Sequence, residues 1–497
     1  MSQAPFIIRG AQVLEDPASQ LPDLKRADIL VENGIITEIG YPLIQAEGVS
    51  TVIDASGFLA MPGLINAHFH SPGNLMKGSL PGLPLEIFML YEVPPLGAEV
   101  PDPSVTRICT LIGAAEMLKN GITSVMDDAY HVPCVTRENI DAIAQAYADI
   151  GIRATIAIDQ PNKLEYEKYP YLESLLPSDI KEKFRELPRQ SSKELLNLYN
   201  HLFERWHGSH NGRIRAAVSC SAPQRVTDDY MQGLNSLSIE RSVPFNMHIL
   251  ETKLQRVFGD EVLGMSLVEF AYDRGILHEH SVVIHAIWIN DRDIELLAKT
   301  GVTIAHNPIC NLRLGSGVAP YYKWREAGIP ISLGTDEAIS DDKVNLFDVM
   351  KMTGLIHNLK QANWDLWPSA NEILGHALAG GARALGLENI GRLKAGFQAD
   401  IVLLDLQGTA LNPANHLQRQ LVYCEDGRSV KHVFVAGRQV VKNGELTLID
   451  EDSLKQEASS IRKQQLLKAP RSEANSLEPY YRQMLAKAEE KICSNLF

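Results

Sequence analysis

Apolar runs rich in valine and isoleucine alternate with longer amphipathic segments between residues 61 and 390, and this alternation restricts the possible folds more than any other feature. Eight such runs occur, at residues 63–70, 122–126, 153–158, 214–219, 244–248, 281–285, 302–306 and 329–334. Strands that alternate with helices along a chain form parallel sheets covered by helices. The sequence therefore predicts an α/β fold in which residues 61–390 form a (β/α)8 TIM-like barrel.

The two ends of the chain follow a different pattern. Short apolar runs separated by glycine, asparagine and aspartate fill residues 5–60, and this pattern returns after about residue 390. Such spacing is typical of hairpins. We therefore expect residues 1–60 and 391–451 to form one small composite β-sandwich domain built from both termini. Residues 452–497 are charged with spaced leucine and isoleucine, which predicts a C-terminal helical extension.

The charge balance argues against nucleic-acid binding. Lysine and arginine number 47 against 61 aspartate and glutamate, a net charge of −14, whereas a nucleic-acid binder needs a basic face. The sequence has no run of about 18 apolar residues for a membrane span, and its first residues lack the pattern of a secretory signal. The six cysteines form no CxxC pair, which favours reduced thiols. We expect a cytoplasmic protein that acts on a small molecule, without nucleic-acid or membrane partners.

Titratable side chains stand where the predicted strands end. His68 and His70 close the first run two residues apart, so both imidazoles point to the same side of a strand. Barrel enzymes place their chemistry at strand ends, where His248 and Asp336 also lie. Three imidazoles and one carboxylate form a ligand set suited to zinc, with iron as the alternative. The sequence therefore predicts one divalent metal ion held by His68, His70, His248 and Asp336.

Further residues at strand ends have predicted roles in catalysis. Glu251 follows His248 by three residues and could carry a proton without binding the metal. His285 ends the next run and could hydrogen-bond the attacked group or a developing oxyanion. Asp336 could also accept a proton from the metal-activated water. Four candidates for substrate contacts, for which a structural role is an open alternative, are Asn74, Asp159, Gln160 and His306; Asp127 and Asp128 are candidates for capping the next helix.

Blocks of sequence around these residues follow one another in a recognisable order: 62–70 (PGLINAHFH), 248–251 (HILE), 283–286 (VIHA), 306–308 (HNP), 311–317 (NLRLGSG), 333–336 (LGTD), 380–387 (GGARALGL) and 396–402 (GFQADIV). Together they resemble the amidohydrolase superfamily, in particular its mononuclear deaminase and chlorohydrolase branch. The resemblance implies hydrolysis of a C–N bond other than a peptide bond. The implied reaction is deamination of an aminated heterocycle of the purine, pterin, pyrimidine or s-triazine type. Relatives commonly form dimers or larger homo-oligomers.

Two departures from the family pattern bear on the reaction. Binuclear relatives carry a lysine at the end of the fourth strand, but residues 214–220 contain none, which favours a single metal ion. Nucleoside-type deaminases carry a histidine where this chain has Ser221, which argues against a ribose-bearing substrate. The alternative reactions are dechlorination, alkylamine release, and opening or closing of a cyclic amide or ureide. A non-catalytic scaffold is disfavoured because the complete ligand set is present.

Overall fold

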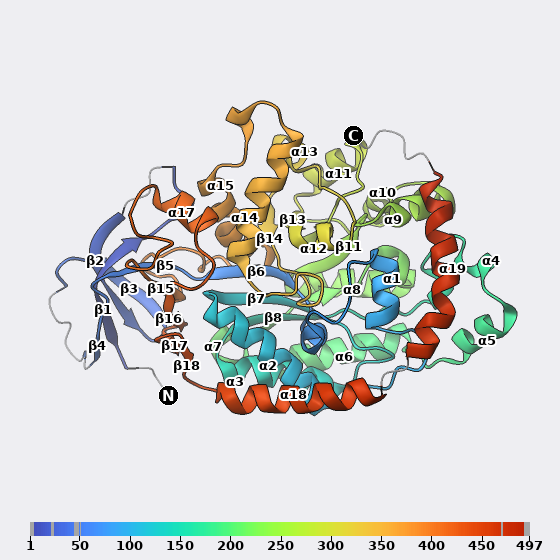
Figure 1. Cartoon of the computed structure of the whole chain (residues 1–497), viewed down its shortest axis with the longest axis horizontal. Coiled ribbons are helices and arrows are strands. Elements are labelled where there is room, and N and C mark those ends of the chain that lie inside the picture. The colour runs from blue at the N-terminus through green and yellow to red at the C-terminus, as the bar shows by residue number, and fades with distance from the viewer. Residues whose placement is uncertain (1–3, 21–23, 44–48, 50, 469–470, 492–497) are drawn as a thin grey trace.

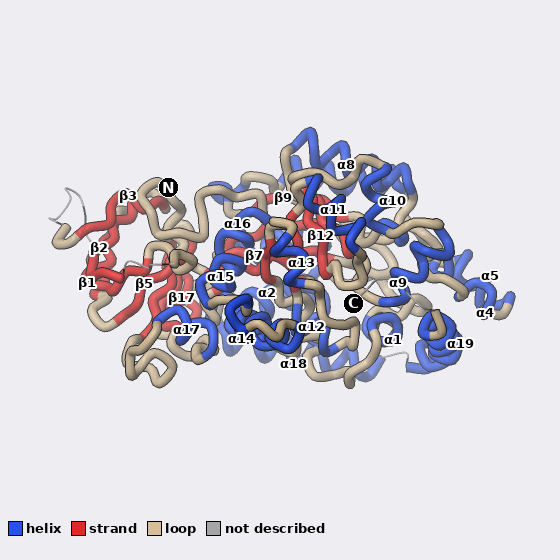
Figure 2. The backbone as a smooth tube through the Cα atoms, turned by 90° about the horizontal axis from the view of Figure 1, so that it is seen from above, coloured by secondary structure: helices blue, strands red, loops and turns tan. Residues whose placement is uncertain are grey.

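Strands gather at two places in the molecule, one at an end and one at the centre (Figures 1 and 2). The computed structural model describes residues 4–20, 24–43, 49, 51–468 and 471–491. Within these residues the strands form a nine-stranded sheet at the end of the molecule, and a four-stranded and a five-stranded sheet at its centre. The two central sheets contain all the predicted strand ends that bear histidine, so they position the candidate site.

The two central sheets follow the predicted alternation of strands and helices. Their strands pair in parallel, in the order in which they occur along the chain. The strands are β6 (Leu64–Phe69), β7 (Ile122–Ala129), β8 (Arg153–Ile158) and β9 (Ile214–Ala216) in one sheet, and β10 (Val218–Ser219), β11 (Phe245–Ile249), β12 (Ser281–His285), β13 (Thr303–His306) and β14 (Ile331–Leu333) in the other. The α/β class with parallel sheets is therefore confirmed.

Backbone hydrogen bonds join the two central sheets into a ring. Residues 214–219, predicted as one strand, are divided between β9 and β10 at Ala217, whose amide donates to the carbonyl of Ile156 over 2.8 Å. On the opposite side, the amide of Asp336 donates to the carbonyl of His68 over 3.0 Å. The first and last strands therefore meet, as a (β/α)8 barrel requires.

Helices cover the outer face of these strands, which explains why the strands are apolar throughout. All five residues of β12 are buried, and its Val-Val-Ile centre suits a strand that is covered on both faces. The helices around the central strands include α2 (Pro103–Lys119), α3 (Arg137–Ile150), α6 (Ser192–Arg205), α8 (Asp228–Arg241), α10 (Leu267–Asp273), α11 (Asp291–Thr300), α13 (Tyr321–Glu326) and α14 (Leu346–Ile356). Further helices are α5 (Ser178–Glu186), α7 (Ser209–Gly212), α12 (Pro308–Arg313), α15 (Ala370–Gly375) and α16 (Gly381–Ala384).

The start of α3 corrects one prediction. Thr136 caps this helix in a reciprocal capping box with Asn139, and Gly151 ends it with a φ of 92°, a conformation that glycine adopts without strain. Asp127 and Asp128 do not cap it, because β7 continues to Ala129 and keeps both carboxylates inside the strand. Both side chains are buried, with no exposed area.

Strands from both termini share the nine-stranded sheet. Its order is β18-β17-β16-β15-β5-β1-β2-β3, with β4 paired to β1. The N-terminal strands are β1 (Phe6–Leu14), β2 (Leu24–Glu32), β3 (Ile35–Gly40), β4 (Thr51–Asp54) and β5 (Phe58–Pro62), and the later ones are β15 (Ile401–Asp405), β16 (Val430–Val435), β17 (Arg438–Lys442) and β18 (Glu445–Leu446). The antiparallel pair of β5 and β15 joins the two ends of the chain. The arrangement of these strands as a two-layered sandwich stays a prediction.

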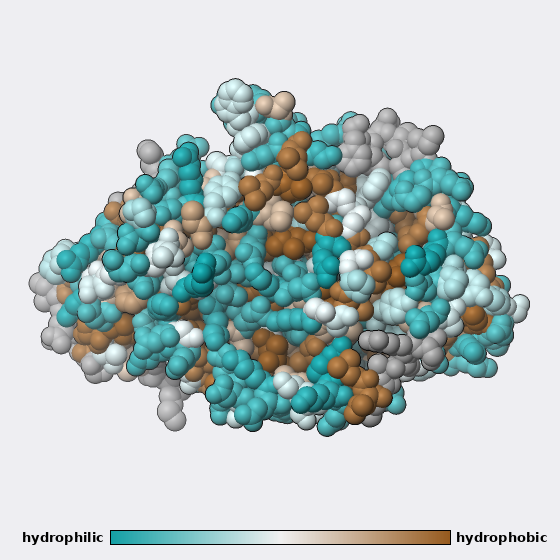
Figure 3. All heavy atoms as spheres, in the orientation of Figure 1, coloured by the Kyte–Doolittle hydropathy of each residue, from teal (hydrophilic) through white to brown (hydrophobic). Residues whose placement is uncertain are grey.

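The last part of the chain forms two helices on the outside of the molecule. They are α18 (Glu451–Lys468), which lies against α2, and α19 (Arg471–Glu489), which packs on α1 (Leu85–Glu92) and α9 (Lys253–Phe258) (Figure 1). Residues 492–497 of the predicted extension lie outside the described residues. No described helix combines the length and the apolar character that crossing a membrane requires. Hydrophilic residues cover most of the face seen in Figure 3, and hydrophobic residues gather there in separate patches.

Candidate active site

The four predicted metal ligands lie together at one end of the ring of strands. The imidazole of His68 lies 4.6 Å from that of His70 and 5.0 Å from that of His248, measured between ring centroids. The carboxylate of Asp336 lies 3.6 Å from Nε2 of His68 and 3.7 Å from Nε2 of His70. Side chains that are up to 268 residues apart in the sequence (336 − 68) therefore share one centre.

The polar atoms of this centre fit a divalent cation. Both ring nitrogens of His68 are buried, and neither has a hydrogen-bond partner among the described residues. Buried polar atoms almost always have a partner, and His68 lacks one while lying among other potential ligands, which fits a metal site. The potential ligand atoms of His68, His70 and Asp336 lie within 4.8 Å of one another. The same holds for the group His68, His248 and His285 and for the group His70, Asp159 and His248. Nitrogen and carboxylate donors in this number suit zinc.

Hydrogen bonds from the surrounding chain fix the orientation of the imidazoles. Nδ1 of His248 lies 2.8 Å from the carbonyl oxygen of Ser221, and Nδ1 of His70 contacts the carbonyl oxygen of Asp128. Nδ1 of His285 lies 2.8 Å from Oδ1 of Asn311. Because Nδ1 is engaged on the outside, Nε2 of each ring remains free for the centre, the usual arrangement around a protein-bound metal.

Burial and neighbouring charges set the protonation of the histidines. Burial lowers the pKa of His68 well below its usual value, and His70, His248 and His285 lower it further. Burial likewise lowers the pKa of His248. Burial also lowers the pKa of His70, but Asp336, Asp159 and Asp128 outweigh this and raise it overall. His68 and His248 are therefore neutral at pH 7, which is the form that binds a metal.

Glu251 and His285 lie next to the predicted ligands. Nε2 of His285 is 3.7 Å from the carboxylate of Glu251 and 3.5 Å from that of Asp336. Burial raises the pKa of Glu251 above the ordinary value for glutamate. A raised carboxyl pKa brings this group closer to neutral pH, where a carrier of protons must both gain and lose a proton.

The backbone at this end of the strands is strained. Ser221, Leu250, His285 and Asp336 have positive φ values of 59°, 53°, 70° and 60°, at or just beyond the ends of β10, β11, β12 and β14. Residues other than glycine avoid this left-handed region, at a cost of about 1–3 kcal/mol each. Such strain persists where the surrounding structure fixes side chains in functional positions.

A cavity, here called the inner cavity, opens onto the centre. Asp159, one of the predicted substrate contacts, lines it. Its other polar lining residues are His70, Tyr130, Ser221, Arg225, His248, Glu251, His285, Asp336, Glu337 and Ser340. Sequence reasoning missed Tyr130, Arg225, Glu337 and Ser340. Glu337 directly follows Asp336, so its position next to a motif was the available signal.

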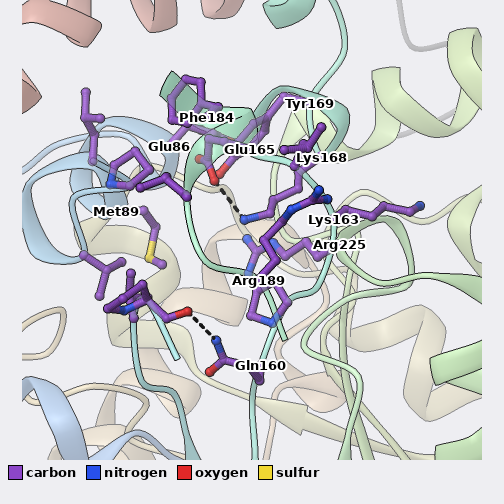
Figure 4. A pocket seen from close by; sticks show the side chains of 18 of the residues that line it. Glu86, Met89, Gln160, Lys163, Glu165, Lys168, Tyr169, Phe184, Arg189 and Arg225 are labelled. Carbon is purple, nitrogen blue, oxygen red and sulfur yellow. Dashed lines mark hydrogen bonds and ion pairs between the residues drawn. The ribbon is translucent and has the colours of Figure 1, made fainter. Parts of the chain in front are cut away.

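Figure 4 shows residues that line a second cavity, here called the outer cavity. Met89, Val93, Val132, Pro161 and Arg225 line both, so the two cavities share this part of their walls. Gln160, a predicted substrate contact, lines the outer cavity, and its side-chain amide donates to the carbonyl of Pro133 over 3.4 Å. The segment around α1, from Leu83 to Leu96, contributes a wall to both.

Asn74 and His306 lie away from these two cavities. The side-chain amide of Asn74 donates to the carbonyl of Cys109 over 2.8 Å, which attaches the short helix η1 (Ser71–Met76) to α2. Nε2 of His306 lies 3.0 Å from Nε2 of the equally buried His357. The structure therefore places Asp159 and Gln160 at the cavities and gives the other two candidates partners within the fold.

Comparison with known proteins places the chain in a family. Residues 59–440 match the model of the amidohydrolase family. A 5′-deoxyadenosine deaminase of Methanosarcina mazei is 31% identical over 456 residues, which cover 92% of this chain and 97% of that protein. A zinc-bound adenosine deaminase of Xanthomonas campestris superposes with a TM-score of 0.81 at 24% identity, over 92% of this chain and 98% of that one. A zinc-bound atrazine chlorohydrolase of Arthrobacter aurescens also gives 0.81, at 26% identity, over 92% and 100%. The chain belongs to the amidohydrolase family.

Proposed function

We propose that this amidohydrolase removes an amino group by hydrolysis from a purine-type heterocycle. One observation supports the proposal above all others. Nε2 of His285 lies 3.7 Å from the carboxylate of Glu251 and 3.5 Å from that of Asp336, and all three residues line the inner cavity beside the predicted metal ligands. Deamination needs a place for the proton of water, a source of protons for the ring and the leaving amine, and a donor to the developing oxyanion. These three side chains offer one group for each need.

His68, His70, His248 and Asp336 are the residues that would hold the metal ion. When bound, a divalent cation of this kind lowers the pKa of a coordinated water from ~16 toward ~7. Asp336 has a carboxylate oxygen 3.5 Å from Nε2 of His285, and it can accept the proton that the attacking water loses. Residues 214–220 supply no lysine, so the ligands support one ion rather than two.

Glu251 transfers protons to and from the heterocycle. In its protonated form, which burial favours, it delivers a proton to the ring nitrogen beside the attacked carbon. Glu251 then takes up the proton that Asp336 accepted from water and passes it to the amino group, which leaves as ammonia. As the carbon–oxygen double bond forms, the hydroxyl proton of the intermediate returns to Glu251, so both carboxyl groups regain their starting forms. His285 hydrogen-bonds the oxygen on which negative charge develops.

The names of the relatives support one substrate class, and one alternative reaction remains. The relatives named above include deaminases of adenine-containing nucleosides, which supports an adenine-like ring as the reacting part. Ser221 lies at the inner cavity in place of the histidine of nucleoside-type deaminases, so a contact between that histidine and ribose is not available here. Dechlorination of a triazine, the reaction named for one structural neighbour, is the second candidate.

The experiment is a release assay on the zinc-loaded protein. Adenine, adenosine, pterin, cytosine and aminated s-triazines with and without a chlorine or alkylamino substituent are supplied, and ammonia, chloride and alkylamine are measured separately. We expect ammonia from at least one purine-type substrate. The variant Glu251→Gln should retain the metal and lose at least about 100-fold in kcat, because proton transfer contributes that much or more. Release of chloride without ammonia would assign the second candidate, and no release at all would refute hydrolysis of this substrate class.

We also propose the wider organisation that the sequence suggests. Residues 1–60 and 391–451 would form the composite β-sandwich, 61–390 the catalytic barrel and 452–497 a helical extension. The shared nine-stranded sheet supports the first of these units. A homo-oligomer in the cytoplasm completes the proposal, and sedimentation velocity on the full chain tests its assembly.

A further inference from the structure

Cationic side chains gather around the outer cavity of a protein whose net charge is −14. Lys163, Lys168, Arg189 and Arg225 line this cavity, together with the carboxylates of Glu86 and Glu165. In Figure 4, Lys163, Arg189 and Arg225 lie on the side of the cavity away from Met89. A local excess of one charge in a hollow concentrates ligands of the opposite charge there.

The two carboxylates of the outer cavity are engaged within the protein. Glu165 forms an ion pair with Lys168 at 2.8 Å and accepts a hydrogen bond from the hydroxyl of Tyr481 at 2.7 Å. Glu86 accepts a hydrogen bond from the hydroxyl of Thr252 at 2.7 Å, and burial raises its pKa. Lys163, Arg189 and Arg225 have no carboxylate of the described residues within 4.0 Å.

Arg225 has the most informative position of the three. It lies in the short helix η3 (Pro223–Arg225), just after the fourth barrel strand, and lines both cavities. Its Nη1 donates to the hydroxyl of Ser221 over 3.4 Å, a single long contact for a guanidinium with five N–H donors. Arg225 is half-buried, has no ion-pair partner among the described residues and lines both cavities, so its guanidinium can form a bidentate contact with an anion.

We propose that the outer cavity binds an anionic substituent of the substrate, a carboxylate or a phosphate, with Arg225 as its main contact. Lys163 and Arg189 add charge farther from the centre. The heterocycle then occupies the inner cavity while its anionic arm extends past Met89 and Val93 into the outer one. This inference rests on the proposed function for the position of the ring, but the binding of the anion is measured independently of turnover.

The test uses two matched pairs of probes and the zinc-loaded full chain. Adenosine 5′-monophosphate is compared with adenosine for a phosphate, and 9-(2-carboxyethyl)adenine with 9-propyladenine for a carboxylate. Dissociation constants are measured by calorimetry, and ammonia release gives kcat and KM. We expect the anionic member of one pair to bind at least about tenfold more tightly, as one charge-assisted contact implies. The pair that shows the preference identifies the anion.

Variants then assign the contact to Arg225. Arg225→Gln should reduce the anionic-to-neutral preference at least about tenfold, mainly through KM. Arg292→Gln is the matched control, because Arg292 is exposed on α11 and pairs with Glu295. It should keep the wild-type preference. Equal affinity for both members of each pair, or a preference that persists in Arg225→Gln, would overturn the inference. If the inference fails but the neutral members still release ammonia, the proposed function stands. If the anionic members bind selectively but no ammonia is released, the inference stands and the proposed function is refuted.

Discussion

Replacement of His68 tests whether this buried histidine is a metal ligand or has a structural role only. Its ring nitrogens have no partner among the described residues, and it adjoins every other predicted ligand. We expect His68→Ala to lose the bound metal and to lower ammonia release by at least about 1,000-fold, because the remaining groups cannot acidify water alone. Metal content by mass spectrometry and activity are measured on the same sample.

The control for this substitution is the chain's second pair of histidines two residues apart. His278 is half-buried, and its Nε2 lies 3.1 Å from Oδ1 of Asn235, so it has a structural partner. His278→Ala should keep both metal and activity. An active His68→Ala protein with a full complement of zinc would show that the four side chains do not form the centre.

His131 gives a prediction about pH and stability. Burial lowers its pKa to about 4 from 6.5, and only 2% of the residue is exposed. Between pH 6.5 and 4 the unfolded chain therefore binds a proton that the folded chain does not, so folded-state stability is complete above pH 6.5 and falls as the pH drops. From pH 7 to 5 this one histidine should remove about 2 kcal/mol.

Urea unfolding at the two pH values measures this effect. His131→Gln should show a smaller loss of unfolding free energy between pH 7 and pH 5 than the wild type. His210→Gln is the control, because His210 is exposed in the structure and its replacement should leave most of the pH dependence in place. Identical pH dependence in the wild type and His131→Gln would contradict the prediction.

The sequence predicted the candidate metal ligands, but it did not predict the residues that contact them only in the folded structure. His68, His70, His248 and Asp336 stood at strand ends, and they do lie together. Asn311 and Ser221, which orient two of the imidazoles, act through contacts across neighbouring strand ends, which local sequence cannot reveal. Arg225 was missed for the same reason, since its place between two cavities depends on how separate loops meet.

Among the elements, helix α19 links the end of the chain to the site. Leu477, Tyr481 and Met484 are buried in a cluster with residues of α1 and α9, and Tyr481 also lines the outer cavity. Leu477→Ala should lower the free energy of unfolding by about 2–5 kcal/mol, because it removes a fully buried side chain and leaves a cavity. Thermal and urea unfolding provide the measurement.

A second leucine supplies a control of the same residue type. Leu467, near the end of α18, is 88% exposed, whereas Leu477 is 0% exposed. Leu467→Ala should change stability by less than about 0.5 kcal/mol, as is usual for exposed positions. Equal effects of the two substitutions would mean that α19 does not pack on α1 and α9 as described.

Some boundaries of the strands could be predicted from sequence patterns alone, and others could not. Residues 153–158 and 281–285 form β8 and β12 over the predicted ranges, because runs of β-branched residues buried on both faces are distinctive. The strand predicted at 214–219 is interrupted at Ala217, where the backbone leaves one sheet and joins the next. The packing partners of α18 and α19 were not predictable, since they depend on contacts more than 300 residues away, such as Tyr481 with Glu165.

For the whole molecule, removal of the metal should abolish activity but not the fold. The strands are joined by backbone hydrogen bonds that need no ion, so far-UV circular dichroism should stay unchanged after dialysis against a chelator. Added zinc should restore ammonia release. It should also stabilise the protein by about 2.7 kcal/mol when the free ion is at 100 times its dissociation constant. Loss of helical signal without the ion would instead mean that the metal is needed for folding.

The bond between the amide of Asp336 and the carbonyl of His68 has a consequence for biosynthesis. Two histidines of the centre leave the ribosome early, whereas the aspartate emerges only after some 270 further residues have been translated. A nascent chain that stops before this aspartate has an open ring and an incomplete coordination sphere. We therefore expect the ion to be acquired only after the final strand has docked against the first.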